Sequence, residues 1–317
     1  MIKINRCGVC MHDVAVRDGT LRRGVQMPCI LGHEIAGEVV AVGADVTTLK
    51  YGDRVATVQR AFVCGQCRFC RSGRETLCPS ARFLGDVEMV GGYAEYVSLS
   101  EDNVAVVPDG VTDDQAAIAA CTVGTILNAI NDVGKVRPGE RVLVTGAGGG
   151  LGMHAVQLAR LAGAEVIALT SSPTKADQVR AAGADVVVVS GRGEDFSRAV
   201  RDATNGEGVD VAIDNVGTPV FDGIRRSMAL GGRWVLIGQV TGQFVPFNPA
   251  QLFLRGISML SATSTTREQL RTSLRLIEQK RVTPVIQEVL PLEEATQAHS
   301  RVERGQVLGR LLLDPTE

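Results

Sequence analysis

The chain has 317 residues, 45% hydrophobic and 21% charged, as is usual for a soluble globular protein, and its length favours two domains. Its 33 Lys and Arg residues nearly balance 35 Asp and Glu residues and are scattered, so no basic stripe predicts a nucleic-acid partner. No run of about 18 apolar residues predicts a membrane span, and the first residues lack the features of a secretory signal. We therefore expect a cytoplasmic protein with no membrane partner.

The chain up to about residue 121 combines short β-like runs with many cysteines. Segments such as HEIAGEVVAVG and YAEYVSLS, separated by Gly and Pro, predict antiparallel strands. In a chain of this size without a signal, clustered cysteines more often bind metal than form disulfides. The eight cysteines are Cys7, Cys10, Cys29, Cys64, Cys67, Cys70, Cys78 and Cys121.

Possible metal ligands occur in three segments of this part that are far apart in sequence. They are Cys10-Met-His12-Asp13, Gly32-His33-Glu34 and Cys121 in AACTVGT. A single His or Cys is more often structural than a ligand. Two Cys and one His together would form a three-ligand zinc site with a position left for water or substrate, the form expected of catalytic zinc. Spacing alone leaves open whether they converge.

A denser cysteine cluster lies at residues 64–78. Two-residue spacers separate Cys64, Cys67 and Cys70, and Cys78 follows after seven residues, so four thiolates can close a tetrahedral zinc shell. With no open coordination position, such a site would be structural. The alternatives are an iron–sulfur cluster, which thiolates also hold, and free or disulfide-bonded cysteines in a polar loop.

From Arg141 onward, apolar strands alternate with helical segments such as GLGMHAVQLARLAG and PTKADQVRAAG. This alternation predicts a parallel sheet covered on both faces, and six strands are the number in a complete doubly wound dinucleotide fold. The six strand candidates are Arg141–Thr145, Glu165–Thr170, Asp185–Ser190, Asp210–Asn215, Arg233–Gly238 and Ile257–Ala262.

After about Ala262, REQLRTSLRLIEQKRV predicts an amphipathic helix and GRLLLD a final strand. The predicted fold class is therefore α/β. A doubly wound parallel (Rossmann) sheet occupies 122–261, and a β-rich catalytic domain is formed by 1–121 together with 262–317.

The first strand of the α/β region leads into a glycine-rich turn and then a helix. The turn reads Gly146-Ala147-Gly148-Gly149-Gly150-Leu151-Gly152, which fits G-x-x-G-x-x-G rather than G-x-G-x-x-G. Such a turn lets backbone N–H groups and the helix N-terminus bind a pyrophosphate, so we expect the cofactor loop here, with a flexible linker as the alternative.

The end of the second strand bears on the choice between NAD and NADP. An acidic residue there would accept hydrogen bonds from the ribose of NAD, but the sequence reads Ser171-Ser172-Pro173-Thr174-Lys175. The two serine hydroxyls and Lys175, which can pair with a 2′-phosphate, favour NADP(H) over NAD(H). A helix N-cap at Ser172 would also explain the segment, and both interpretations can hold together.

The motifs resemble the medium-chain zinc alcohol dehydrogenase family, and they occur along the chain in the family's order. The resemblance covers essentially the whole chain. The resemblance is carried by CGVC with a following Asp, GHEIAGEVVAVG, the C-x2-C-x2-C-x7-C loop and CTVGT. It implies that the β-rich domain is GroES-like, that Cys10, His33 and Cys121 hold a catalytic zinc ion, and that the cysteine cluster holds a structural one. It also places Glu34 near the metal, Asp13 as the hydrogen-bond acceptor of His33, and Thr125 against the nicotinamide.

Val216 and Gly238, which follow and end the fourth and fifth strand candidates, complete the predicted cofactor site. Cys7 and Cys29 are interpreted as small buried residues.

Two departures from the family stand out. Its members usually have Ser or Thr where this chain has His12, whose imidazole could pass a proton in the same way or could narrow the pocket. They also usually have tens of residues before CGVC, whereas this chain starts almost at the motif, which leaves the completeness of the outer domain open.

The resemblance implies hydride transfer between NADP(H) and an alcohol, aldehyde or ketone, assisted by zinc. A closer resemblance, in AACTVGTILNAI, DNVGTPVFDGIRRSMALGGRWVLIGQV and SATSTTREQLRTSLRLIEQKRVTPVI, is to acryloyl-CoA reductases. The alternative function is therefore NADPH-dependent reduction of an enoyl-CoA. Relatives associate through the edge of the cofactor-domain sheet, so we expect a dimer or tetramer.

Overall fold

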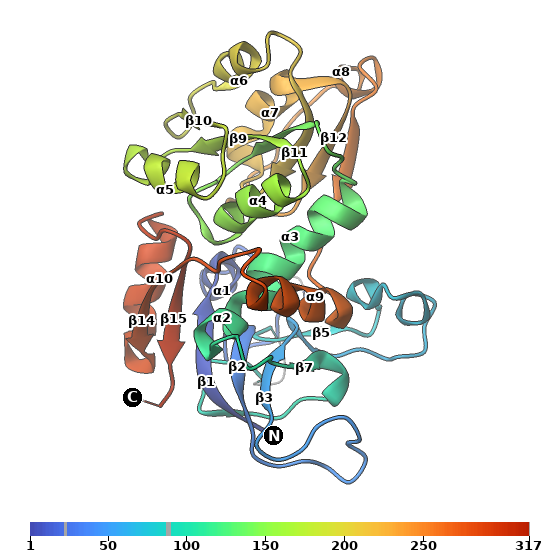
Figure 1. Cartoon of the computed structure of the whole chain (residues 1–317), viewed down its shortest axis with the longest axis vertical. Coiled ribbons are helices and arrows are strands. Elements are labelled where there is room, and N and C mark those ends of the chain that lie inside the picture. Colours follow the sequence, from blue (N-terminus) through green and yellow to red (C-terminus); the bar gives the residue numbers. More distant parts are fainter. Residues whose placement is uncertain (22–23, 87–89, 317) are drawn as a thin grey trace. The chain divides into compact units, whose positions relative to one another are not determined.

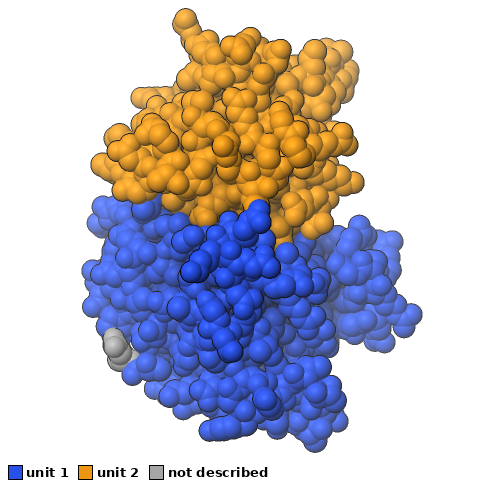
Figure 2. Space-filling view, in the orientation of Figure 1, with its two compact units in different colours: residues 1–125, 264–317 blue, residues 126–263 orange. Residues whose placement is uncertain are grey.

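The computed structural model describes residues 1–21, 24–86 and 90–316, which fold into two compact units (Figure 1). The first unit comprises Met1–Thr125 and Ser264–Glu317, and the second comprises Ile126–Thr263 (Figure 2). The division expected from the sequence, at 121/122 and 261/262, lies a few residues before these boundaries.

The second unit is built on a parallel six-stranded sheet. The strand order is β10-β9-β8-β11-β12-β13, and each pair of neighbours is parallel. This is the doubly wound order, whose switch point lies between β8 and β11. The predicted Rossmann sheet is confirmed, although β12 begins earlier than expected. The strands are β8 (Arg141–Val144), β9 (Glu165–Thr170), β10 (Val186–Val189), β11 (Val209–Asp214), β12 (Met228–Leu236) and β13 (Ser258–Ser261).

Helices cover both faces of this sheet, with α4 and α5 on one side and α6 and α7 on the other (Figure 1). On the α6/α7 side, Phe196, Phe221 and Trp234 pack with strand residues such as Leu143 and Ile167 in one buried cluster. This apolar layer keeps the carboxyl ends of the strands at one rigid edge. The helices are α4 (Gly150–Leu161), α5 (Ala176–Ala181), α6 (Ser197–Ala203), α7 (Phe221–Ser227) and α8 (Ala250–Phe253), with 3-10 turns η6 (Pro173–Lys175) and η7 (Thr218–Val220).

The first unit contains a seven-stranded sheet in which the two ends of the chain meet. The order is β14-β15-β1-β2-β3-β7, with β6 also paired to β1, and every pair is antiparallel except β14–β15. The strands are β1 (Ile2–Val9), β2 (Glu34–Val39), β3 (Arg54–Thr57), β6 (Tyr96–Val97), β7 (Val104–Val106), β14 (Ile286–Pro291) and β15 (Arg310–Asp314). A separate pair joins β4 (Arg60–Phe62) to β5 (Arg82–Phe83).

Two helices of the first unit begin at well-formed caps. Thr112 with Gln115 caps α2, and Thr266 with Gln269 caps α9, each as a reciprocal capping box. The expected helix at 267–282 is thus α9, although it ends at Glu278. The α-helices are α1 (Met11–Arg17), α2 (Asp113–Ile118), α9 (Arg267–Glu278) and α10 (Ala295–Glu303), with 3-10 turns η1 (Cys70–Ser72), η2 (Glu75–Leu77), η3 (Glu101–Asn103) and η8 (Leu292–Glu294).

One continuous helical stretch, Asp113–Val133, runs through the boundary between the units. After α2 it contains the π-helical segment η4 (Ala119–Gly124), then α3 (Thr125–Leu127) and a second π-helical segment, η5 (Asn128–Val133). Its length and composition would allow it to cross a membrane, but 78% of its most apolar window is buried in the protein. A core helix of a globular protein has the same composition, so this stretch is weak evidence for a membrane span.

Candidate functional site

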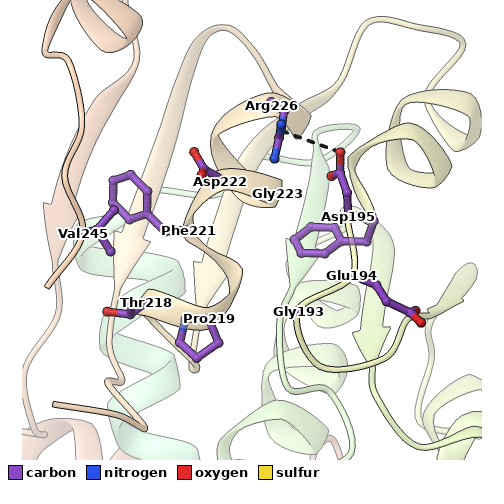
Figure 3. Close-up of a pocket in the computed structure, with 11 residues that line it drawn as sticks. Gly193, Glu194, Asp195, Thr218, Pro219, Phe221, Asp222, Gly223, Arg226 and Val245 are labelled. Carbon is purple, nitrogen blue, oxygen red and sulfur yellow. Dashed lines mark ion pairs between the residues drawn. The ribbon is translucent and has the colours of Figure 1, made fainter. Parts of the chain in front are cut away.

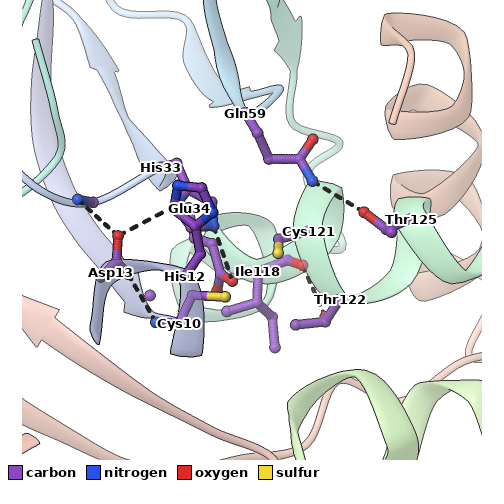
Figure 4. Close-up of polar contacts among 12 residues, drawn as sticks. Cys10, His12, Asp13, His33, Glu34, Gln59, Ile118, Cys121, Thr122 and Thr125 are labelled. Carbon is purple, nitrogen blue, oxygen red and sulfur yellow. Dashed lines mark hydrogen bonds and ion pairs between the residues drawn. The ribbon is translucent and has the colours of Figure 1, made fainter. Parts of the chain in front are cut away.

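Three separate segments of the first unit bring Cys10, His33, Glu34 and Cys121 together (Figure 4). Cys10 directly follows β1, His33 and Glu34 stand at the start of β2, and Cys121 lies in the π-helical segment η4. One ligand atom from each of the four lies within 4.8 Å of the others. Two thiols, an imidazole and a carboxylate are donors that zinc accepts, and four such atoms at this spacing fit one ion.

The buried carboxylate of Glu34 is neutralised by Arg310 from β15. Arg310 Nη2 lies 2.5 Å from Glu34 Oε1, and its Nε lies 3.1 Å from Oε2, which makes a two-point ion pair. Gly8 faces Glu34 across the β1–β2 ladder, and any Cβ on Gly8 would overlap the Glu34 carboxylate at 2.1 Å. Burial raises the pKa of Glu34, and the Arg310 cation opposes that rise.

The same guanidinium faces the two thiols. Arg310 Nη2 lies 3.2 Å from Cys10 Sγ and 3.5 Å from Cys121 Sγ. The hydrogen bond from the neighbouring thiol of Cys121, together with Arg310 and His33, lowers the pKa of Cys10 well below its usual value, against the effect of burial. A buried cation beside two thiols favours the thiolate form that a metal ion requires.

His33 is held by Asp13 on its outer side. His33 Nδ1 lies 3.3 Å from Asp13 Oδ1, and its Nε2 faces the Glu34 side of the cluster at 3.9 Å. Asp13 also accepts hydrogen bonds from the backbone N–H groups of Cys10 and Gly32. Burial raises the pKa of the completely buried Asp13 carboxyl, but the adjacent His33, through its charge and its hydrogen bond, lowers it below its usual value. Asp13 is therefore placed to orient the ring of His33.

The polar contacts continue from Asp13 to the C-terminal part of the chain. Tyr93 Oη lies 3.5 Å from Asp13 Oδ2 and 2.9 Å from Nε2 of His299 in α10. A consistent arrangement has His299 donate to Tyr93 and Tyr93 donate to Asp13. Tyr93 and, through it, His299 thus hold the Asp13 carboxylate that contacts His33, and both lie far from Asp13 in the sequence.

His12 has its own carboxylate partner. Its Nε2 lies 2.8 Å from Asp86 Oδ1, and its ring lies 4.7 Å from the ring of Phe83 and 5.1 Å from that of His33. About a quarter of the His12 side chain is exposed, whereas His33 is completely buried. The imidazole therefore borders the metal-ligand cluster with its orientation fixed by Asp86.

The four clustered cysteines also converge. All four sulfur atoms lie within 4.8 Å of one another, and the Cys67–Cys70, Cys64–Cys78 and Cys64–Cys70 pairs are 3.5, 3.6 and 4.0 Å apart. Backbone N–H groups of Cys67, Cys70 and Cys64 point at the sulfurs of the cluster, and such bonds lower the pKa of Cys64 to about 6. All eight cysteines are free thiols, so the disulfide alternative is wrong. Four thiols in this arrangement fit a closed zinc shell.

The glycine-rich turn of the second unit has the geometry that its spacing predicted. Gly146 has φ +61° and a Cβ on Gly152 would lie 2.0 Å from Gly146 O, so both positions require glycine. Gly149 is the N-cap of α4, which begins with Gly150, Leu151 and Gly152. The backbone N–H groups of this first turn are thus available at the carboxyl end of β8.

The alkyl chain of Lys175 lies against this turn. A Cβ on Gly148 would lie 2.6 Å from Lys175 Cδ, so the glycine leaves the space that the lysine stem fills. Burial lowers the pKa of Lys175. Ser171 and Ser172 precede it, and Ser172 Oγ lies 2.8 Å from Thr174 Oγ1. The residues expected at the cofactor's phosphates therefore lie together at one edge of the sheet.

A buried carboxylate shapes the loop after β11. Asp214 accepts hydrogen bonds from Thr145, Trp234 and the backbone N–H groups of Val216 and Gly217. A Cβ on Gly238 would lie 2.3 Å from Asn215 O, so the segments after β11 and β12 approach closely at Gly238. Val216 and Gly238 thus stand beside the switch point of the sheet.

A cavity of about 230 Å³ opens at the same end of the second unit (Figure 3). The loop after β10 forms one wall with Phe196, Glu194 and Asp195, and the other wall is formed by Thr218 of η7 and Phe221 at the start of α7. Asp195 is paired with Arg226 at 3.8 Å. No motif in the sequence marks these residues as part of a binding site, because they do not differ from an ordinary loop and helix start.

Other residues of the site were also missed. Arg310 stands in the apolar run GRLLLD, and only its burial beside β1 reveals its role. Asp86, Tyr93 and His299 belong to no metal-ligand spacing. One expectation was wrong in part: Cys7 is completely buried, but Cys29, in the loop between α1 and β2, is partly exposed.

Comparison with known proteins agrees with this fold. Residues 1–109 match the alcohol dehydrogenase GroES-like domain, and residues 150–279 match the zinc-binding dehydrogenase domain. The acryloyl-coenzyme A reductase of Sulfurisphaera tokodaii is 32% identical over 99% of this chain and 92% of its own length. The crystal structure of AibC has a TM-score of 0.91 and 46% identity, covering 100% of this chain and 87% of that one. An NAD-dependent alcohol dehydrogenase structure has a TM-score of 0.91 and 35% identity, covering 99% and 90%.

A GroES-like unit with a cluster of metal-ligand residues, joined to a Rossmann unit, defines a nicotinamide-dependent oxidoreductase. The chain belongs to the medium-chain zinc alcohol dehydrogenase family, with similarity to its acryloyl-coenzyme A reductases.

Proposed function

We propose that the protein is a zinc-dependent oxidoreductase that transfers hydride between NADP(H) and an alcohol, aldehyde or ketone. The observation that carries this proposal is the convergence of Cys10, His33 and Cys121 beside Glu34. These residues would hold a catalytic zinc ion, which supplies Lewis-acid polarisation of a substrate oxygen when bound. Cys64, Cys67, Cys70 and Cys78 would hold a second, structural zinc ion.

The chain's own residues have distinct tasks in this proposal. Asp13 orients His33, and Arg310 balances the charges of Glu34 and the two thiolates. His12, held by Asp86, faces the space beside the ligands and contacts substrate there. Thr125 contacts the nicotinamide, as its position in CTVGT implies from the family.

The proposed cofactor is NADP(H), bound at the glycine turn with Lys175 at the 2′-phosphate. Two features support this choice. The chain has Ser171 and Ser172 where an acidic residue would favour NAD, and Lys175 packs against Gly148. The cavity between Phe196 and Phe221 would receive the adenine end, because it lies at the carboxyl edge of the sheet and offers aromatic walls with acidic acceptors.

A second candidate is reduction of an α,β-unsaturated acyl-CoA by NADPH. Two observations favour it: the similarity to acryloyl-coenzyme A reductases and the presence of His12 where alcohol-oxidising relatives have Ser or Thr. In that reaction hydride would add to the β-carbon and a proton to the α-carbon, which leaves a saturated thioester.

The two candidates are separated by the variant His33→Ala, which removes one ligand of the catalytic site. Turnover is measured with alcohols, aldehydes and enoyl-CoA thioesters, each with NADPH and NADH, and metal content is measured in parallel. We expect a folded, NADPH-binding variant that has lost one zinc equivalent and nearly all carbonyl reduction. Undiminished carbonyl reduction would overturn the zinc-assisted proposal, whereas enoyl-CoA turnover that survives the substitution would favour the second candidate.

We also propose that the protein forms homo-oligomers through the free edge of the second unit's sheet. Strand β13 is the last in the order, and large apolar side chains in the segment that precedes it in the sequence are exposed, namely Leu230, Phe244, Phe253 and Leu254. Light scattering should give a dimer or tetramer, and Phe253→Glu should dissociate it. A monomeric wild-type protein would refute this part.

A further inference from the structure

A buried hydrogen-bond network in the first unit joins the residues at which the chain leaves and re-enters that unit. Gln59, which follows β3, is at its centre and is only 2% exposed. Its Oε1 accepts hydrogen bonds from Ser264 Oγ at 2.8 Å and from the backbone N–H of Thr265 at 3.2 Å. Its Nε2 donates to Thr125 Oγ1 at 3.0 Å (Figure 4). Thr125 is the last residue before the second unit, and Ser264 is the first after it.

The network fixes which way the Gln59 amide points. A backbone N–H can only donate, so the atom that faces Thr265 must be the amide oxygen. The amide nitrogen therefore faces Thr125, whose hydroxyl oxygen accepts. Among the described residues no other group bonds to Thr125 Oγ1, in contrast to Thr122, which donates to Ile118 O at 2.8 Å. The Thr125 O–H is consequently left with a proton to donate.

The part of the network at Ser264 and Thr265 combines a strained backbone with a buried cation. Ser264 has φ +58°, a left-handed conformation that residues other than glycine rarely adopt. Arg60 Nη1 donates to Ser264 Oγ at 2.7 Å, and its Nη2 donates to Thr265 O at 2.6 Å. Burial lowers the pKa of Arg60 to about 10, which still leaves the cation charged at neutral pH. A strained backbone and a buried cation persist together only where the surrounding contacts over-determine them.

The two segments also pack tightly against each other. A Cβ on Gly124 would lie 2.4 Å from Thr265 Oγ1, so only glycine before Thr125 allows this approach. Thr125 therefore has little freedom: its backbone is fixed by Gly124 against Thr265, and its hydroxyl is fixed by Gln59.

We propose that Gln59 is a positioning residue for the cofactor, which acts by committing the Thr125 hydroxyl to donate a hydrogen bond. The group of matching chemistry is the carboxamide oxygen of the nicotinamide. This inference rests on the proposed contact between Thr125 and the nicotinamide. Because Gln59 occupies the acceptor side of the hydroxyl, a bound nicotinamide meets a donor in one fixed direction.

The test uses Gln59→Glu in the full-length protein. A carboxylate keeps the acceptor for Ser264 and Thr265 but replaces the donor to Thr125 with a second acceptor, so Thr125 must turn its proton toward it. Calorimetry should show NADPH binding weakened about three- to tenfold, the worth of one hydrogen bond. Binding of 2′-phospho-ADP-ribose, which lacks the nicotinamide, should be unchanged. The matched control is Asn103→Asp, the same chemical change at a buried amide that donates to Ala61 O.

Thr125→Val distinguishes a failure of this inference from a failure of the proposed contact. If the contact is correct, Thr125→Val weakens NADPH by a similar factor, and adding Gln59→Glu weakens it no further. An unchanged NADPH affinity in Thr125→Val would overturn the contact itself and the inference with it. If Thr125→Val weakens binding but Gln59→Glu does not, or if Gln59→Glu weakens both ligands equally, only the role of Gln59 is overturned. Should Gln59→Glu fail to fold, Gln59→Met, which neither donates nor accepts, gives the same comparison of the two ligands.

Discussion

Removing the Arg310 guanidinium should expose how much the charge balance at the metal-ligand cluster contributes to stability. Arg310→Met keeps the length of the side chain and removes the cation. Glu34, which is completely buried, would then lose both contacts of its two-point ion pair, at 2.5 and 3.1 Å. Loss of one partner from a buried pair costs about 3–5 kcal/mol, because the other charge is left without compensation. We expect a free energy of unfolding lower by about 3 kcal/mol at neutral pH.

The loss should depend on pH in a direction that the structure fixes. Burial raises the pKa of Glu34, and Arg310 opposes that rise, so without Arg310 the folded-state pKa moves further above the unfolded value. The variant's penalty is present above that folded-state pKa and shrinks as the pH falls and Glu34 takes up a proton. The difference from wild type should therefore be smaller at about pH 5 than at about pH 8.

Urea unfolding followed by circular dichroism measures this difference. The single tryptophan, Trp234, lies in the second unit, so its fluorescence would report on the wrong part of the chain. The matched control is the double variant Glu34→Gln with Arg310→Met, which removes both charges and should recover much of the loss. A single variant that loses less than about 1 kcal/mol, or one whose loss is independent of pH, would refute the buried-charge argument.

Three further predictions concern the metal centres and the cofactor. Cys67→Ser opens the four-cysteine shell, so it should lower the melting temperature and remove one zinc equivalent without weakening NADPH binding; retention of two equivalents would contradict the assignment. Lys175→Glu should weaken NADPH about ten- to hundredfold and NADH little in direct titrations, whereas equal losses would make Lys175 structural. Tyr93→Phe should speed zinc loss to a chelator several-fold, because Asp13 loses a donor, while the exposed Tyr96→Phe should leave it unchanged.

The sequence predicted the second unit well because its signals are local. Continuous apolar strands, helices between them and a glycine turn after the first strand determine a doubly wound sheet almost without reference to distant contacts. The cysteine cluster was equally easy to recognise from the sequence, since its four cysteines lie within one short segment. The family's motifs supplied Cys10, His33 and Cys121, which the spacing alone left unconnected.

The remaining site residues depend on contacts that local patterns do not encode. Arg310 reaches Glu34 only because β15 pairs with β1, and β15 alone reads as an apolar strand with a polar start. The role of Gln59 depends on its hydrogen bonds with Thr125 and Ser264. The whole second unit lies between these two residues in the sequence. Cys121 lies in a π-helical segment, a register that the apolar composition of this segment does not indicate. Each of these is a tertiary contact between segments whose own composition is unremarkable.

The pairing of β15 with β1 also has a consequence for biosynthesis. Arg6 and Asp314, 308 positions apart, form an ion pair across the sheet, and β1 reaches the ribosome exit long before its neighbour. The contiguous second unit can fold while synthesis continues, but one edge of β1 stays unpaired until β15 has been synthesised. An unpaired strand edge is prone to associate with other chains, so the nascent first unit is the part most in need of a chaperone. Slower translation of the second unit would lengthen the time during which this edge of β1 is unpaired, and would lower the yield of active enzyme.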